Sequence, residues 1–136
     1  MFSFVGRPAQ ILAPNEGKTN FSVLVCGNAI GQFVPANIIY KGSDISISFG
    51  WISNGPEDAT YNTSKNGWMT AECFQAWIKW FDKYLEKSSI QKPEMLLMDG
   101  CSSHISLSIV EEARSRRIIL VKLPPNATHV LMKIYT

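Results

Sequence analysis

The sequence predicts a single α/β domain with a mixed β-sheet and flanking helices. Three observations lead to this prediction. Two β-rich runs joined by a short turn indicate an antiparallel hairpin, a long amphipathic segment indicates a helix, and two apolar runs around a second helical segment indicate parallel strands. Apolar residues make up 46% of the 136 residues and charged residues 18%, which is typical of a globular chain.

The first predicted element is the hairpin. Phe21–Cys26 is a β-rich run, residues 27–31 supply turn chemistry, and a second run follows from Phe33 to Tyr40. Pro35 indicates a strand start or an exposed edge, because proline cannot donate to a strand ladder.

A long connection is predicted to follow the hairpin. Residues 43–65 are rich in Ser, Asn, Gly and Pro, and their apolar side chains alternate only briefly, over residues 45–49. We therefore expect at most one weak strand in this part of the chain.

The most regular predicted helix begins after Thr70. The Thr70 hydroxyl can cap the first backbone donors, Glu72 suits the positive helix start, and Met69 can contact Phe74 as a hydrophobic staple. Apolar side chains recur at helical spacing, and two further aromatic rings widen the same face: Phe74, Trp77, Ile78, Phe81 and Leu85, with Trp80 and Tyr84. We expect this stripe to be core rather than a ligand site.

A strand, a helix and a second strand are predicted next. Met95–Met98 is fully apolar, as in strands buried on both faces. A shorter helix is expected to begin between Ser103 and Ser108, where Ser108 and Glu111 can form a capping box. Ile118–Val121 reads as another buried strand, so the unit is a right-handed parallel crossover. The helix ends among cations that suit a helix C-terminus: Arg114, Arg116 and Arg117.

Asp99 is the first candidate for chemistry. The apolar run Met95–Met98 ends on this carboxylate, and strand ends of open α/β sheets line the crevice where ligands are held. A hard divalent cation binds such a carboxylate together with waters and a substrate phosphate. His104 lies five residues further on and can orient a phosphate or an outer ligand. The plainer alternatives are an Asp-Gly turn for Asp99 and a cap or surface position for His104.

A second polar cluster follows the last predicted strand. Pro124 and Pro125 fix an extended path, and Asn126, Thr128 and His129 would then stand beside the strand end that carries Asp99. An ordinary strand-exit loop is the alternative interpretation of the same residues.

Composition and motifs exclude several other functions. Three cysteines without a C-x-x-C pair argue against a disulfide framework or a structural zinc site and favour a reducing compartment. The chain has no G-x-S-x-G, G-x-x-x-x-G-K or G-x-G-x-x-G motif and no apolar run of bilayer length. We therefore expect a soluble protein that is neither secreted nor membrane-bound. A net charge of +2 means that attraction to nucleic acid must come from local patches.

Four segments, taken in order, resemble the DDE superfamily endonuclease domain of pogo, Tigger and jerky-type transposases and their domesticated relatives. They are residues 26–31, Gly67–Thr70 with the aromatic residues after it, Met98–His104, and Leu123–Leu131. The resemblance implies an RNase H-like fold in which three carboxylates hold two Mg²⁺ or Mn²⁺ ions for attack on a DNA phosphodiester. It also implies a nuclear location and a possible homo-oligomer in the complete protein.

Carried onto this sequence, the resemblance makes Asp99 a catalytic metal ligand, the second acid of the three. It places His104, Asn126, Thr128 and His129 near the substrate. The other two acids have no match, because no Asp or Glu occurs in the first fifteen residues and none follows Leu131.

These departures lead us to expect a partial domain over residues 1–136, a fragment that lacks the first core strand and the C-terminal helix. Such a chain would contact DNA but be inactive alone, and marginally stable unless Phe2–Val5 fills the central gap. Two alternatives remain: a domesticated nuclear module that binds DNA or protein without catalysis, and an unrelated α/β domain in which Asp99 and residues 126–129 are not neighbours.

Overall fold

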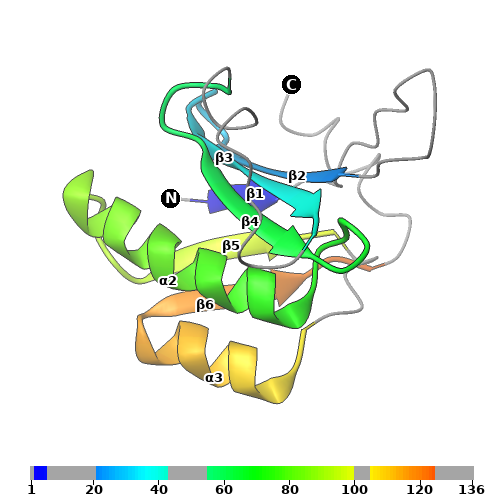
Figure 1. The fold of residues 1–136 in the computed structure, drawn as a ribbon. Helices are drawn as coiled ribbons and strands as arrows, with labels where there is room; N and C mark the ends of the chain where they lie inside the picture. The colour runs from blue at the N-terminus through cyan, green and yellow to red at the C-terminus, as the bar shows by residue number, and fades with distance from the viewer. Residues whose placement is uncertain (1, 6–20, 43–54, 100–104, 125–136) are drawn as a thin grey trace.

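The computed structural model describes residues 2–5, 21–42, 55–99 and 105–124, the first of these ranges by its backbone alone. They form a six-stranded mixed sheet in the order β4-β3-β2-β1-β5-β6, with two helices, α2 and α3, packed on one face (Figure 1). The predicted α/β class is confirmed, and the sheet is consistent with an incomplete RNase H-like fold. The strands are β1 Phe2–Val5, β2 Phe21–Asn28, β3 Phe33–Lys41, β4 Thr60–Ser64, β5 Glu94–Met98 and β6 Ile118–Lys122.

The four-residue strand β1 occupies the centre of the sheet. It pairs antiparallel with β2 and parallel with β5, with Val5 in register with both Cys26 and Met98. Phe2–Val5 thus fills the central gap, which is the possibility that the sequence analysis left open for a domain without its first core strand. This pairing matters for stability, since each unpaired backbone group at a buried seam costs about 1–3 kcal/mol. The predicted absence of a C-terminal helix concerns residues 125–136, which lie outside the described residues.

The hairpin of β2 and β3 forms as predicted, with its turn shifted along the chain. Gly27 and Asn28 are the last residues of β2 rather than part of the turn. The Asn28 carboxamide oxygen accepts hydrogen bonds from the backbone N–H groups of Ile30 (3.2 Å) and Gln32 (2.9 Å). Gly31 has a φ of 83°, which explains why the turn needs glycine there.

Strand β4 pairs in parallel with the outer side of β3, over Asn37–Lys41. Pro35 is the third residue of β3 and precedes the stretch that pairs with β4, so its place near the strand start agrees with the prediction. It lies where the pairing of β3 with β2 shifts, between Leu24 and Cys26. The strand in the predicted connection lies at its end, at Thr60–Ser64, and residues 45–49 lie outside the described residues. The residues of β4 are polar, so the sequence gives no clear sign of this strand. The buried Asn37 of β3 donates a hydrogen bond to Thr60 Oγ1 at 2.7 Å and so holds β4 against β3.

Helix α2 spans Ala71–Lys87 and begins where the sequence predicts. The Thr70 hydroxyl accepts a hydrogen bond from the Cys73 backbone N–H at 3.2 Å. The five residues at helical spacing are buried in the core, whereas Trp80 and Tyr84 are partly buried and pack against it. The rings of Trp77 and Phe81 stack with centroids 4.9 Å apart. The aromatic stripe is therefore core.

Helix α3 spans Leu107–Ser115 and begins inside the predicted window, but the predicted capping box is wrong. Ser106 is the N-cap residue and makes no side-chain capping bond. Ser108 lies in the first turn, and its hydroxyl pairs with that of Ser106 at 2.7 Å. Ile109 and Ala113 bury the inner side of the helix against the core.

The two faces of the sheet differ in burial. On the helix-covered face of β5, Leu96 and Met98 are buried, whereas Met95 and Leu97 on the other face are only half-buried. Ile119 of β6 is 48% exposed. The prediction that these strands are buried on both faces is therefore wrong, because both described helices pack on the same face (Figure 1).

A buried carboxylate joins α2, α3 and the approach to β5. Asp82 accepts hydrogen bonds from Lys92 Nζ and from Arg116 Nη1, the latter at 2.8 Å. Burial raises the pKa of Asp82, but the hydrogen bonds and charges of the two cations outweigh it and hold that pKa below its usual range. Arg116, which the sequence assigns to the helix C-terminus, thus also ties α3 to α2.

Candidate functional site

Asp99 lies at the carboxyl end of β5 and is 8% exposed. Met98, the residue before it, is in register with Val5 of β1 and with Lys122 of β6. The Leu123 backbone N–H donates to the Met98 carbonyl oxygen at 2.9 Å, so β6 leaves the sheet directly beside Asp99. The strand-end position predicted for Asp99 is the one that the structure shows.

The other predicted site residues lie outside the described residues. This applies to His104, Asn126, Thr128 and His129. Three of them, Asn126, Thr128 and His129, follow Leu123 and Pro124 in the chain, and Leu123 is hydrogen-bonded to the end of β5. That polar groups from two strand ends converge on Asp99 remains a prediction.

The described surroundings of Asp99 do not suit a pair of divalent ions. β1 consists of Phe2, Ser3, Phe4 and Val5 and therefore has no carboxylate. On the other side, the residue in register with Met98 is a lysine, Lys122. Within the described ranges no group of three or more His, Cys, Asp and Glu side chains could hold a metal ion. Two ions need several fixed oxygen ligands, and one carboxylate does not provide them.

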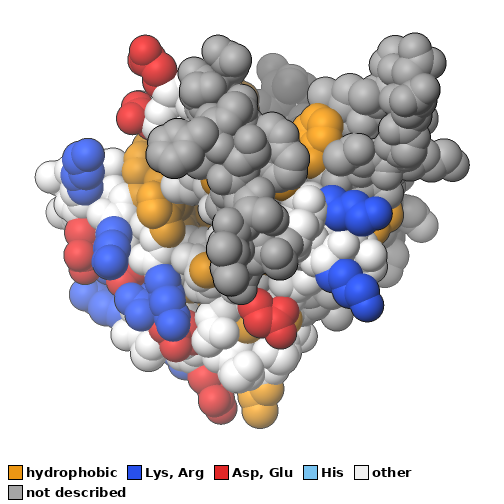
Figure 2. All heavy atoms as spheres, viewed as in Figure 1, with side chains coloured by type: hydrophobic (Ala, Val, Ile, Leu, Met, Phe, Trp, Pro, Cys, Tyr) orange, Lys and Arg blue, Asp and Glu red, His pale blue; other side chains and the backbone are white. Residues whose placement is uncertain are grey.

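Exposed lysines stand at the same end of the sheet as Asp99. β1, β3, β4, β5 and β6 all run in one direction, so Lys41, Lys65 and Lys122, which end or follow three of these strands, share that end. All three side chains are exposed, and none pairs with a carboxylate of the described residues. Figure 2 shows blue side chains at this end of the molecule, apart from the mixed charges along α2.

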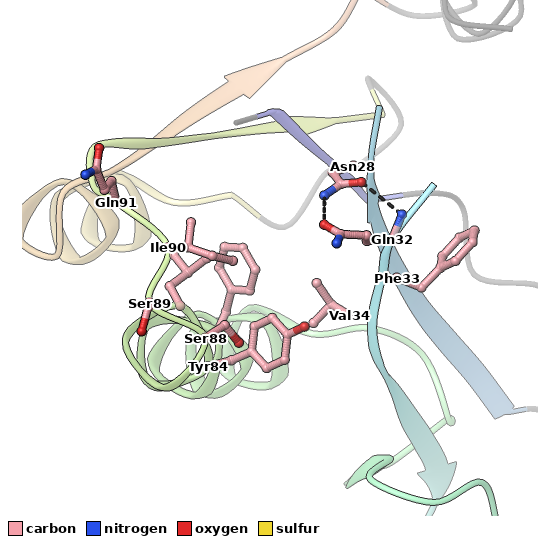
Figure 3. Close-up of a pocket in the computed structure, with 11 residues that line it drawn as sticks. Asn28, Gln32, Phe33, Val34, Tyr84, Ser88, Ser89, Ile90 and Gln91 are labelled. Carbon is pink, nitrogen blue, oxygen red and sulfur yellow. Dashed lines mark hydrogen bonds between the residues drawn. The ribbon is translucent and has the colours of Figure 1, made fainter. Parts of the chain in front are cut away.

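A cavity of about 570 Å³ lies at the opposite end of the sheet, between the hairpin turn and the C-terminus of α2. Asn28 and Gln32 line it on the hairpin side, and Tyr84 and Ile90 on the helix side (Figure 3). Every lining residue is uncharged. This cavity is therefore separate from the Asp99 site and has no cation to hold a phosphate.

A comparison with protein-family models now gives the class of the protein. The model described as DDE superfamily endonuclease matches residues 18–134, a range that includes Asp99 and all four of the other predicted site residues. The chain therefore belongs to the DDE superfamily endonuclease family, a family of transposase-like nucleases that act on DNA with divalent metals. β1 precedes the matched range.

The remaining comparisons add no relatives. Neither the curated proteins nor the solved structures include a significant match. Among the described residues, neither helix is long and apolar enough to cross a bilayer.

Sequence reasoning missed the lysines at the carboxyl end of the sheet. Lys41, Lys65 and Lys122 are far apart in the chain, and a net charge of +2 gives no sign of them. The available signal was that Lys41 and Lys122 follow β-rich segments, whereas the polar segment before Lys65 gives no such signal. Using that signal requires the strand directions, and hence the position of β4, which the sequence did not reveal.

Proposed function

We propose that this chain is a transposase-derived DDE domain that binds DNA through the carboxyl end of its sheet and does not cleave it alone. The observation that carries the proposal is the position of Asp99. Asp99 follows the last residue of β5, which lies between β1 and β6. β1 has no carboxylate, and β6 has a lysine in register with Met98. In this proposal Asp99 keeps the family position of a catalytic metal ligand.

The incapacity for cleavage follows from the number of oxygen ligands. In-line phosphodiester cleavage by two metal ions needs carboxylates from several elements to fix both ions. β1 supplies none, and the sequence has no Asp or Glu after Glu112. Mg²⁺ or Mn²⁺ would therefore bind weakly at Asp99.

The binding of DNA is supported by charge and geometry. Lys122 is exposed beside the end of β5, and Lys41 and Lys65 continue the positive charge across the sheet. Four strand spacings of about 4.8 Å separate β6 from β3, so the three cations extend over at least about 19 Å. Such a row suits phosphates spaced along a nucleic acid backbone. His104, Asn126, Thr128 and His129 are proposed to contact the same phosphates.

Two measurements test this proposal. Fluorescence anisotropy with a labelled DNA duplex should show binding that weakens with salt, because lysine–phosphate contacts release counterions. Incubation of supercoiled plasmid with Mg²⁺ or Mn²⁺ should leave the plasmid intact for both the natural sequence and the Asp99→Asn variant. Nicking that Asp99→Asn abolishes would disprove the incapacity for cleavage, and absence of salt-dependent binding would disprove the DNA contact.

A second candidate is a nuclear module that has lost catalysis and serves as a DNA- or protein-binding unit. The composition of β1 favours it, because this neighbour of β5 has no carboxylate that could help Asp99 to fix two metal ions. The two candidates differ in metal dependence. In the module, Mg²⁺ should not increase DNA affinity, and Asp99→Asn should leave that affinity unchanged or raise it slightly.

A further inference from the structure

The turn between β4 and α2 is a compact structure centred on Ser64. The Ser64 carbonyl oxygen accepts hydrogen bonds from the backbone N–H groups of Gly42 (3.0 Å) and Gly67 (3.2 Å). The Ser64 hydroxyl donates to the Trp68 carbonyl oxygen at 2.7 Å. The Ser22 hydroxyl of β2 donates to the Gly67 carbonyl oxygen, also at 2.7 Å. The backbone on both sides of Trp68 is therefore held by neighbouring strands.

This turn brings the backbone of one tryptophan close to that of two lysines. Lys41 is in register with Ser64 across the β3–β4 pair, and Lys65 is the next residue in the chain. Both lysines are exposed, and neither pairs with a carboxylate in the described part of the chain. Trp68 is 47% exposed, in contrast to Trp77 of the core, which is 1% exposed.

Packing does not explain the exposed part of Trp68. Met69, the next residue, packs against the core cluster and provides the apolar contact at the start of α2. An exposed indole on a fixed backbone presents a flat apolar surface at little entropic cost, which is the property of aromatic platforms in single-strand binding sites.

We propose that the turn at Trp68 binds unpaired nucleotides. One base stacks on the Trp68 ring, and the phosphates on either side contact Lys41 and Lys65. The inference rests on the proposed DNA-binding function and specifies which form of nucleic acid this part of the sheet takes. Stacking on an aromatic ring accepts any base, so the site distinguishes unpaired from paired nucleotides rather than one sequence from another.

The site is distinct from Asp99 but lies at the same end of the sheet. Three strand spacings of about 4.8 Å separate β3 from β5, which places Lys41 at least about 14 Å from the strand that ends in Asp99. A strand held at Trp68 could therefore continue across the sheet toward Asp99 and Lys122.

Glu72 provides a test in which a substitution should raise the affinity for nucleotides rather than lower it. This exposed carboxylate lies in the first turn of α2, where hydrogen bonds from its own backbone N–H and from Thr70 lower its pKa. It is therefore charged at neutral pH and repels a phosphate near the turn. Replacing it should strengthen binding at this site, whereas replacing the lysines should weaken binding.

The experiment measures anisotropy of labelled oligothymidine and of a labelled duplex with the full chain. Trp68→Ala should weaken oligothymidine binding about tenfold and change duplex affinity by less than about twofold, whereas Trp68→Phe should restore much of the loss. Lys41→Gln with Lys65→Gln should reduce the salt dependence of oligothymidine binding, and Glu72→Gln should raise affinity. Lys83→Gln, an exposed lysine on α2, is the matched control and should have no effect.

The outcomes separate this inference from the proposed function. If the duplex binds with salt dependence but Trp68→Ala leaves oligothymidine binding unchanged, the inference is wrong and the proposed function stands. If neither nucleic acid binds, both are wrong. If Trp68→Ala fails to fold in a thermal melt, Trp68→Phe and the lysine pair decide, and unchanged oligothymidine binding in both contradicts the inference.

Discussion

The two ends of the sheet carry cations in different settings. At the amino end of β5, Lys92 and Arg116 are paired with Asp82, and each also reaches a glutamate of its neighbouring helix. At the carboxyl end, Lys41, Lys65 and Lys122 are exposed, and no carboxylate of the described residues pairs with them. Cations of the first kind hold elements together, whereas those of the second kind are available to a phosphate. The neighbouring carboxylates, rather than the cations themselves, make this difference.

The largest expected effect is on stability at the amino end. Asp82→Asn should lower the free energy of unfolding by about 3 kcal/mol, because it leaves two cations without the buried charge that they share. Urea unfolding measures this change. Lys122→Gln is the control at the other end and should change stability by less than about 0.5 kcal/mol. Equal losses in the two variants would show that the ends do not differ in this way.

The second prediction concerns acid. The folded-state pKa of Asp82 is lowered, so its contribution is fully present above the pKa of an unfolded aspartate, about 3.9, and is lost as the pH falls through the lower folded value. The stability difference between the natural sequence and Asp82→Asn should therefore be constant near neutral pH and shrink in strong acid. Urea titrations at a series of pH values measure it. If this stability difference grew as the pH fell, the prediction that Asp82 has a lowered pKa in the folded state would be contradicted.

The smallest expected effect is on DNA binding at the carboxyl end. Lys122→Gln should weaken duplex binding by about 1 kcal/mol or less and reduce the slope of log affinity against log salt by about one. Lys79→Gln, an exposed lysine on α2, is the matched control and should leave both quantities unchanged. Identical effects of the two variants would mean that bulk charge, rather than this end of the sheet, attracts DNA.

Local patterns predicted the elements whose signals lie within a few residues. The Thr70 cap and the aromatic stripe of α2 are two such signals, and both are present in the structure. The sequence predicted at most one weak strand between residues 43 and 65 but did not locate β4, because its residues are polar and its partner Asn37 lies more than twenty positions earlier in the chain. The capping box at Ser108 failed because the N-cap residue is Ser106, so the helix begins two residues too early for it.

The candidate site was predictable only in part. An apolar run that ends in a carboxylate predicts a strand-end acid, and Asp99 is one. Whether that acid has partners depends on which strands flank β5, and the occupation of the central position by Phe2–Val5 was left open by the sequence. The placement of Lys122 beside it required the register of β5 with β6.

By itself, the sequence determined the α/β class, the amphipathic helix and the family. Hydrophobic periodicity, helix caps and ordered motifs each depend on residues that are close together in the chain. Tertiary structure alone decided that β1 completes the centre of the sheet, that Arg116 reaches Asp82, and that Lys41, Lys65 and Lys122 share one end. The physical reason is that strand pairing and ion pairing join residues far apart in the chain. Their free energy depends on distances that no local pattern specifies.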